Sequence, residues 1–119
     1  MFGYSLIIDC RSFSDTPLPH EDSQSIPRPD ICIDTDEYHT PETLLIKARN
    51  HFDSLGYNTV RKNKPFSGSL VPSAYYRTEP RVYSLMIEVN RSIYHAQADL
   101  ERVKDHIRQF LESIETAND

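Results

Sequence analysis

Two carboxylates stand where the strongest apolar runs of the chain end. Asp9 follows Leu-Ile-Ile, and Glu88 closes the run Ser-Leu-Met-Ile-Glu. If both runs are parallel strands, the two acids emerge at the same carboxyl edge, where open α/β sheets place their sites. An acid at the end of an apolar strand is partly desolvated, which raises its pKa and suits it to proton transfer. The structural alternative is that each acid bonds a helix N-terminus or a neighbouring arginine.

The histidines and cysteines offer little metal chemistry by spacing. His39 and Glu42 match His-x-x-Glu, a spacing that zinc hydrolases use, but they straddle the expected start of a helix, so their side chains should diverge. Cys10 and Cys32 are expected to be buried thiols on strands. The sequence holds no Gly-rich phosphate loop, nucleophile elbow or Cys-x-x-Cys pair.

The strands that must position Asp9 and Glu88 follow from the apolar pattern. Residues 4–10 and 82–89 are nearly continuous apolar runs, typical of strands buried on both faces. Because long crossovers separate them, we predict that they lie parallel in one sheet. Two shorter strands are predicted at 31–33 and 57–62.

Two helices complete the pattern. Thr40 is a natural N-cap, Pro41 suits the first helical position, and Gly56 stands where a glycine commonly follows a helix. The segment 96–116 has its apolar residues on one face and its charges opposite, as an amphipathic helix does.

The rest of the chain is irregular. Residues 11–29 and 63–73 are punctuated by proline, so they are expected as loops that reach the same sheet edge as the two acids. The order of elements predicts an α/β fold class: a mixed, largely parallel sheet packed by helices. The length predicts a single domain over residues 1–119.

Composition argues against several classes of protein. Thirteen Lys and Arg stand against eighteen Asp and Glu, and a net charge of −5 lacks the basic footprint of a nucleic-acid binder. No window approaches about 18 apolar residues, so no membrane span is expected. The opening residues lack the basic region of a signal peptide, and two cysteines make no disulfide framework. We therefore expect a reduced, cytoplasmic protein.

Four blocks, taken in order, carry a family resemblance. They are LIIDCRSF at 6–13, PDICIDTD at 29–36 with HTP at 39–41, NKPFSG at 63–68 with VP at 71–72, and SLMIEVNR at 84–91. Together they resemble the C-terminal half of the N-formylglutamate amidohydrolase family, over residues 4–95. The resemblance implies half of a zinc-carboxypeptidase-like α/β/α domain, in which helices sandwich a mixed sheet. It also implies an activity that hydrolyses N-formyl-L-glutamate to formate and glutamate.

The resemblance implies a role for Glu88 and none for the family's zinc. Glu88 matches the general acid/base carboxylate, which in the family activates a zinc-bound water. Arg11 stands where the family has its last histidine zinc ligand, and a guanidinium stays protonated and offers only donors. The other two ligands belong to a His-x-x-Glu segment upstream of this strand, and only ten residues precede Arg11. We therefore expect no metal ligands and no cofactor, and an inactive relative.

Other matched positions imply ligand binding. The loop with Asn63, Ser67 and Gly68 resembles the family's substrate-side loop, with Phe66 where tyrosine is common. Asp34 replaces a usual glycine, which is a further departure. These residues are hypothesised to keep a site for a small acidic ligand.

Arg11 and Glu88 are expected to face one cleft, bridged by a salt bridge or a water-filled gap. Arg11 is then either a carboxylate anchor for the ligand or a surface residue with a local partner. A second hypothesis is an interaction module or one half of a split hydrolase, because half of such a sheet exposes an edge strand. Its partner would be a second copy or a complementary chain. A third is that an upstream segment has been lost from the given sequence.

Overall fold

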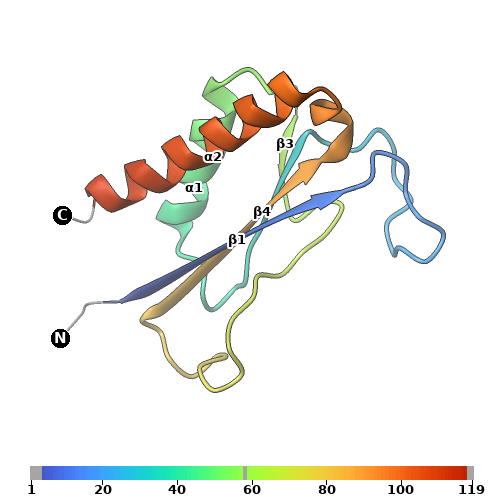
Figure 1. Cartoon of the computed structure of the whole chain (residues 1–119). Helices are drawn as coiled ribbons and strands as arrows, with labels where there is room; N and C mark the ends of the chain where they lie inside the picture. The colour runs from blue at the N-terminus through green and yellow to red at the C-terminus, as the bar shows by residue number, and fades with distance from the viewer. Residues whose placement is uncertain (1–3, 58, 118–119) are drawn as a thin grey trace.

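The computed structural model describes residues 4–57 and 59–117, which form one sheet with its helices (Figure 1). The strands are β1 (Ser5–Phe13), β2 (Ile31–Asp34), β3 (Val60–Lys62) and β4 (Val82–Asn90). Their spatial order is β1-β4-β2-β3. β1 is parallel to β4 and β2 is parallel to β3, whereas β2 runs antiparallel to β4. The predicted mixed, largely parallel sheet is confirmed.

The parallel pairing of the two strong strands is also confirmed. Nine residues of β1 pair in register with nine of β4, from Ser5 opposite Val82 to Phe13 opposite Asn90. β1 runs three residues past its predicted end at Cys10, because the ladder with β4 continues there.

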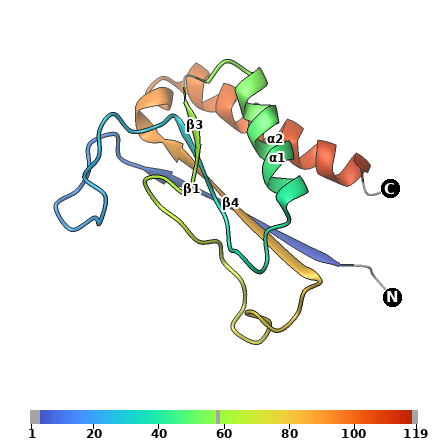
Figure 2. The ribbon, with the colours of Figure 1, turned by 180° about the vertical axis from the view of Figure 1, so that it is seen from behind.

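Both long helices cover the same face of the sheet, as Figures 1 and 2 show from opposite sides. They are α1 (Glu42–Ser54) and α2 (Gln97–Ala117), and a short 3-10 helix, η1 (Arg91–Tyr94), follows β4. Within residues 4–57 and 59–117 there is no second helical layer, so the chain has two layers rather than a sandwich. The irregular segment 63–81 lies against the opposite face instead, where the Ser69 hydroxyl hydrogen-bonds that of Ser84.

The core lies between the sheet and the two helices. Leu85, Ile87 and Val89 alternate along β4 toward this side. They pack with Phe52 of α1 and Phe110 of α2, both fully buried. Burying one such side chain contributes about 1.5–3 kcal/mol, which is what holds the helices on this face.

The first helix begins differently from its sequence prediction. Its cap residue is Pro41, and no side chain caps it. The prediction of Thr40 as the N-cap is wrong, because its hydroxyl accepts from the Asp36 backbone N–H and donates to the Ser84 carbonyl. The prediction for Gly56 is confirmed: it directly follows Leu55, the C-cap of α1, and has φ of +87°.

Two other expectations concern the burial of the cysteines and the absence of a membrane span. Cys10 is exposed, contrary to prediction, because it lies on β1 at the outer edge of the sheet; Cys32 is buried as predicted. Neither long helix, over the part that the structure describes, combines the length and apolarity needed to cross a membrane.

Candidate functional site

The pleat of the sheet places Glu88 opposite the core. Ile87 and Val89 face the helices, so Glu88 between them faces the other way. Its register partners are Arg11 on β1 and Cys32 on β2, and paired residues project from the same face of a sheet. We call this side the polar face, which comprises Asp9, Arg11, Cys32, Asp34, Ser84 and Glu88. The expectation that Arg11 and Glu88 share one face is confirmed.

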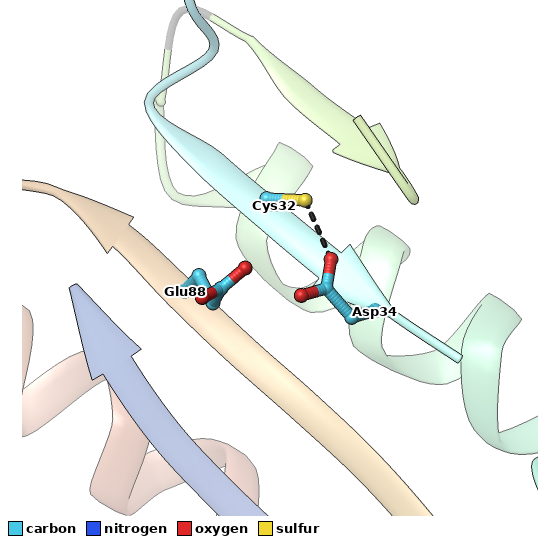
Figure 3. A group of neighbouring side chains, drawn as sticks. All are labelled: Cys32, Asp34 and Glu88. Atoms are coloured by element: carbon cyan, nitrogen blue, oxygen red, sulfur yellow. Dashed lines mark hydrogen bonds between the residues drawn. The ribbon is translucent and has the colours of Figure 1, made fainter. Parts of the chain in front are cut away.

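Three buried side chains converge on this face (Figure 3). One ligand atom each from Cys32, Asp34 and Glu88 lies within 4.8 Å of the others. The Cys32 thiol donates to Asp34 Oδ1 at 2.7 Å, and the Phe66 carbonyl oxygen lies 3.7 Å from the same sulfur. Glu88 is only 7% exposed, and the other two are more deeply buried. Glu88 is thus buried rather than placed on an open wall, and loop 63–73 reaches the cluster at Cys32 through Phe66.

The electrostatics of this cluster favour protonated groups. Burial, followed by hydrogen bonding and the negative charge of Asp34, raises the pKa of Glu88 to about 8, while the nearby Arg11 guanidinium opposes that rise. Burial, again aided by Asp34, raises the pKa of the Cys32 thiol far above its ordinary value. At neutral pH Glu88 therefore keeps its proton, and a protonated carboxyl cannot accept one as a general base.

Arg11 uses a nearer partner than Glu88. Its Nε donates to Asp9 Oδ2 at 3.0 Å, and its side chain is 56% exposed. The expected salt bridge to Glu88 is replaced by this pair, because Asp9 projects two residues away on the same face of β1. Of the alternatives for Asp9 and Arg11, the structure shows the local ion pair.

The three loop residues expected to bind substrate lie together but apart from Arg11 and Glu88. Asn63, Ser67 and Gly68 line a cavity of about 520 Å³ that lies beside the first turn of α1. Asn63 has φ of +55° and holds the loop, since its amide bonds both the backbone N–H and the hydroxyl of Thr35. Ser67 and Gly68 are exposed.

The two proline-rich loops meet over the polar face at a residue that the sequence analysis missed. The Arg28 side chain is fully buried and lies over the rings of Phe13 and Phe66, at 5.8 and 5.2 Å. It forms an ion pair with Glu21 and donates to the carbonyl of Ser14. This arginine joins loop 11–29 to loop 63–73 beside the cluster.

His39 has a structural role. Its ring is fully buried, with Nδ1 2.7 Å from the Val82 carbonyl oxygen, and Nε2 accepts the Arg77 backbone N–H at 2.8 Å. The proton therefore lies on Nδ1, and neither nitrogen is available to a metal ion. Glu42, whose side chain was expected to diverge from His39, is exposed on the first turn of α1.

Comparison with known proteins gives one match. A family model described as N-formylglutamate amidohydrolase matches residues 1–95. No curated protein and no solved structure matches the chain. The matched range includes all four strands and α1, and with them every residue of the polar face, whereas α2 lies beyond it.

Proposed function

Because the chain belongs to the N-formylglutamate amidohydrolase family, we propose that it is a non-hydrolytic member that binds a small acidic ligand. The observation that supports this proposal is the place of Arg11. It stands in register with Glu88, at the position that the resemblance assigns to a zinc-ligating histidine. The family's carboxylate is thus retained beside a residue that cannot ligate its metal.

The residues around Arg11 do not fit the family's zinc ion. A guanidinium has no acceptor lone pair and keeps its positive charge, so Arg11 cannot take the place of a ligating histidine. Asp9 is already paired with that charge. With its pKa raised to about 8, Glu88 is mostly protonated at neutral pH, and in that form it does not act as a general base. We therefore derive no hydrolytic step for this chain.

The cavity lined by Asn63, Ser67 and Gly68 is the best place for the ligand. Two cations, Lys62 and Arg77, and three acids, Asp36, Glu37 and Glu42, line it as well, and the guanidinium and the ammonium are natural partners for a ligand carboxylate. Its volume of about 520 Å³ is in the range of small-molecule sites. Because Asp9 already balances the charge of Arg11 through its Nε, we place the anchor in the cavity.

Hydrolysis is expected to be absent and not to return with one substitution. Wild-type protein and Arg11→His, each supplied with zinc, should release formate from N-formyl-L-glutamate no faster than buffer, because a single histidine does not make the family's three-ligand site. Arg61→His, exposed on β3, is the matched control. Zinc-dependent formate release by either protein would contradict the proposal.

Ligand binding has its own readout. Titration with N-formyl-L-glutamate should shift the amide NMR signals of Ser67 and Gly68, and Arg77→Gln should weaken binding about tenfold or more, the usual effect of losing a charged hydrogen bond. Arg102→Gln on α2, an exposed arginine that is not part of the cavity lining, should bind normally. Unperturbed Ser67 and Gly68 signals at saturating ligand would exclude this cavity.

A second candidate function is pairing with another chain, which the position of β1 favours. β1 is the longer of the two edge strands of the described sheet, with nine residues against three in β3, and Cys10, Arg11 and Ser12 on it are exposed. An uncovered strand edge offers unpaired backbone groups to a second copy or a complementary chain. Light scattering tests pairing with a second copy, since a mass that stays monomeric at all concentrations rules out self-pairing.

A further inference from the structure

We propose that Cys32, Asp34 and Glu88 form a binding site for one divalent transition-metal ion of the zinc class (Figure 3). This site goes beyond the proposed function. It uses none of the zinc-ligand positions that the resemblance assigns, and one of its ligands, Asp34, stands where the family usually has glycine.

The backbone presents the three ligands to one point. Cys32 and Asp34 are two residues apart on β2, so the pleat sends both to the polar face, and the antiparallel register puts Cys32 directly beside Glu88. Their ligand atoms lie within 4.8 Å of one another. Around a tetrahedral zinc ion, with bonds of about 2.0–2.3 Å, ligand atoms are separated by roughly 3.5 Å. Side-chain rotations alone can bring the three atoms to that separation.

Two buried oxygens at this point accept from no N–H, S–H or hydroxyl donor in the described structure. They are Asp34 Oδ2 and Glu88 Oε2, whose residues are 1% and 7% exposed, and only the carboxyl proton of Glu88 can lie between them. A buried polar atom without a partner costs roughly 1–3 kcal/mol in proteins. A cation between the two carboxyl groups would satisfy both oxygens at once. This observation, independent of the clustering, points to a ligand.

Charge and donor type indicate the class of metal. A thiolate with two carboxylates is a borderline-soft set that suits zinc, whereas magnesium and calcium prefer oxygen alone. Three anionic ligands around a divalent ion leave one net negative charge, and Arg11 lies in register beside Glu88 to offset it. Binding at neutral pH releases two protons to solvent, one from the Cys32 thiol and one from the Glu88 carboxyl, and three protein ligands leave a fourth position for water.

The test is a titration of the full chain, stripped with a chelator, with cobalt(II). We expect a thiolate-to-cobalt charge-transfer band that saturates at one equivalent and disappears when zinc is added. Cys32→Ser should abolish the band, and Cys10→Ser, the matched control on the exposed cysteine, should retain it. Asp34→Asn should weaken binding beyond the roughly 10–100-fold typical of losing a residue that only orients a ligand. The exposed Asp22→Asn should not weaken it.

Three outcomes would overturn the site: no thiolate band, a band that survives Cys32→Ser, or a band lost in Cys10→Ser. Circular dichroism checks that each variant folds. Where Cys32→Ser does not fold, zinc titration of wild-type protein gives the answer, since the NMR signals of Cys32 and Glu88 should shift and those of Cys10 should not. Formate release is not a readout here, so hydrolysis would contradict the proposed function without touching this site.

Discussion

The unfolding free energy of the metal-free protein should fall by several kcal/mol, at most about 5, between about pH 5 and about pH 9. The cause is Glu88, whose pKa burial and Asp34 raise from 4.5 to about 8. The native state holds this proton more tightly than the unfolded chain does. The resulting stabilisation is complete below pH 4.5 and is lost as the pH rises through about 8.

Substitution isolates this effect from other titrating groups. Glu88→Gln keeps a neutral, hydrogen-bonding side chain, so urea unfolding should show a flatter pH dependence and a more stable variant than wild type at about pH 9. Glu79→Gln is the control, because pairing with Arg81 lowers the pKa of Glu79 to about 2, well outside the window. Parallel curves for wild type and Glu88→Gln would refute the buried-proton account.

Breaking the Arg28–Glu21 pair should cost about 3 kcal/mol of unfolding free energy. In Glu21→Ala the Arg28 guanidinium stays buried without its carboxylate. The cost falls at the low end of the roughly 3–5 kcal/mol seen for such losses, since Arg28 keeps carbonyl acceptors at Ser14 and Ser23. Urea unfolding measures the loss, and faster proteolysis within residues 14–30 should accompany it.

Two further variants test whether the loss of stability comes from the uncompensated charge of buried Arg28. Glu79→Ala breaks an exposed pair with Arg81 and should cost no more than about 1 kcal/mol. Adding Arg28→Met to Glu21→Ala should recover part of the loss, because the uncompensated charge is then gone and the methionine can still lie between Phe13 and Phe66. If the double variant were less stable than Glu21→Ala, the Arg28 charge would be stabilising without its partner.

Local patterns predicted the elements well but not all of their relations. The apolar runs around Ile7 and Leu85 were long enough to indicate buried strands, and the glycine at 56 marked the helix end, because these signals act within a few residues. The antiparallel direction of β2 against β4 has no local signal in a strand as short as Ile31–Asp34. Thr40 has a residue type that commonly caps helices, but its hydroxyl donates a hydrogen bond to a carbonyl oxygen of β4 instead.

The site was predicted only in part, because local patterns do not show how β2 pairs with β4. Glu88 and Arg11 could be placed on one face because both lie on long strands whose parallel pairing was predicted. The thiol–carboxylate cluster could not, since Cys32 and Asp34 meet Glu88 only through the antiparallel register. The Cys-x-Asp spacing on a short strand, which sends two ligands to one face, is the signal that could have suggested it. Arg28 lies in a proline-rich loop, where sequence alone indicates exposure.

The pleat of β4 lets this fold diverge one side at a time. Side chains that face the helices are constrained by core packing, where a change of a single methylene alters stability. Those on the polar face, such as Arg11 on the neighbouring strand, project away from the helices, so a substitution at an exposed position there can alter chemistry without disturbing the core. Arg11 and Asp34, the two marked departures from the family pattern, both lie on that face. At the exposed positions of that face, a fold of this architecture can therefore change the ligand it binds while the core between sheet and helices stays the same.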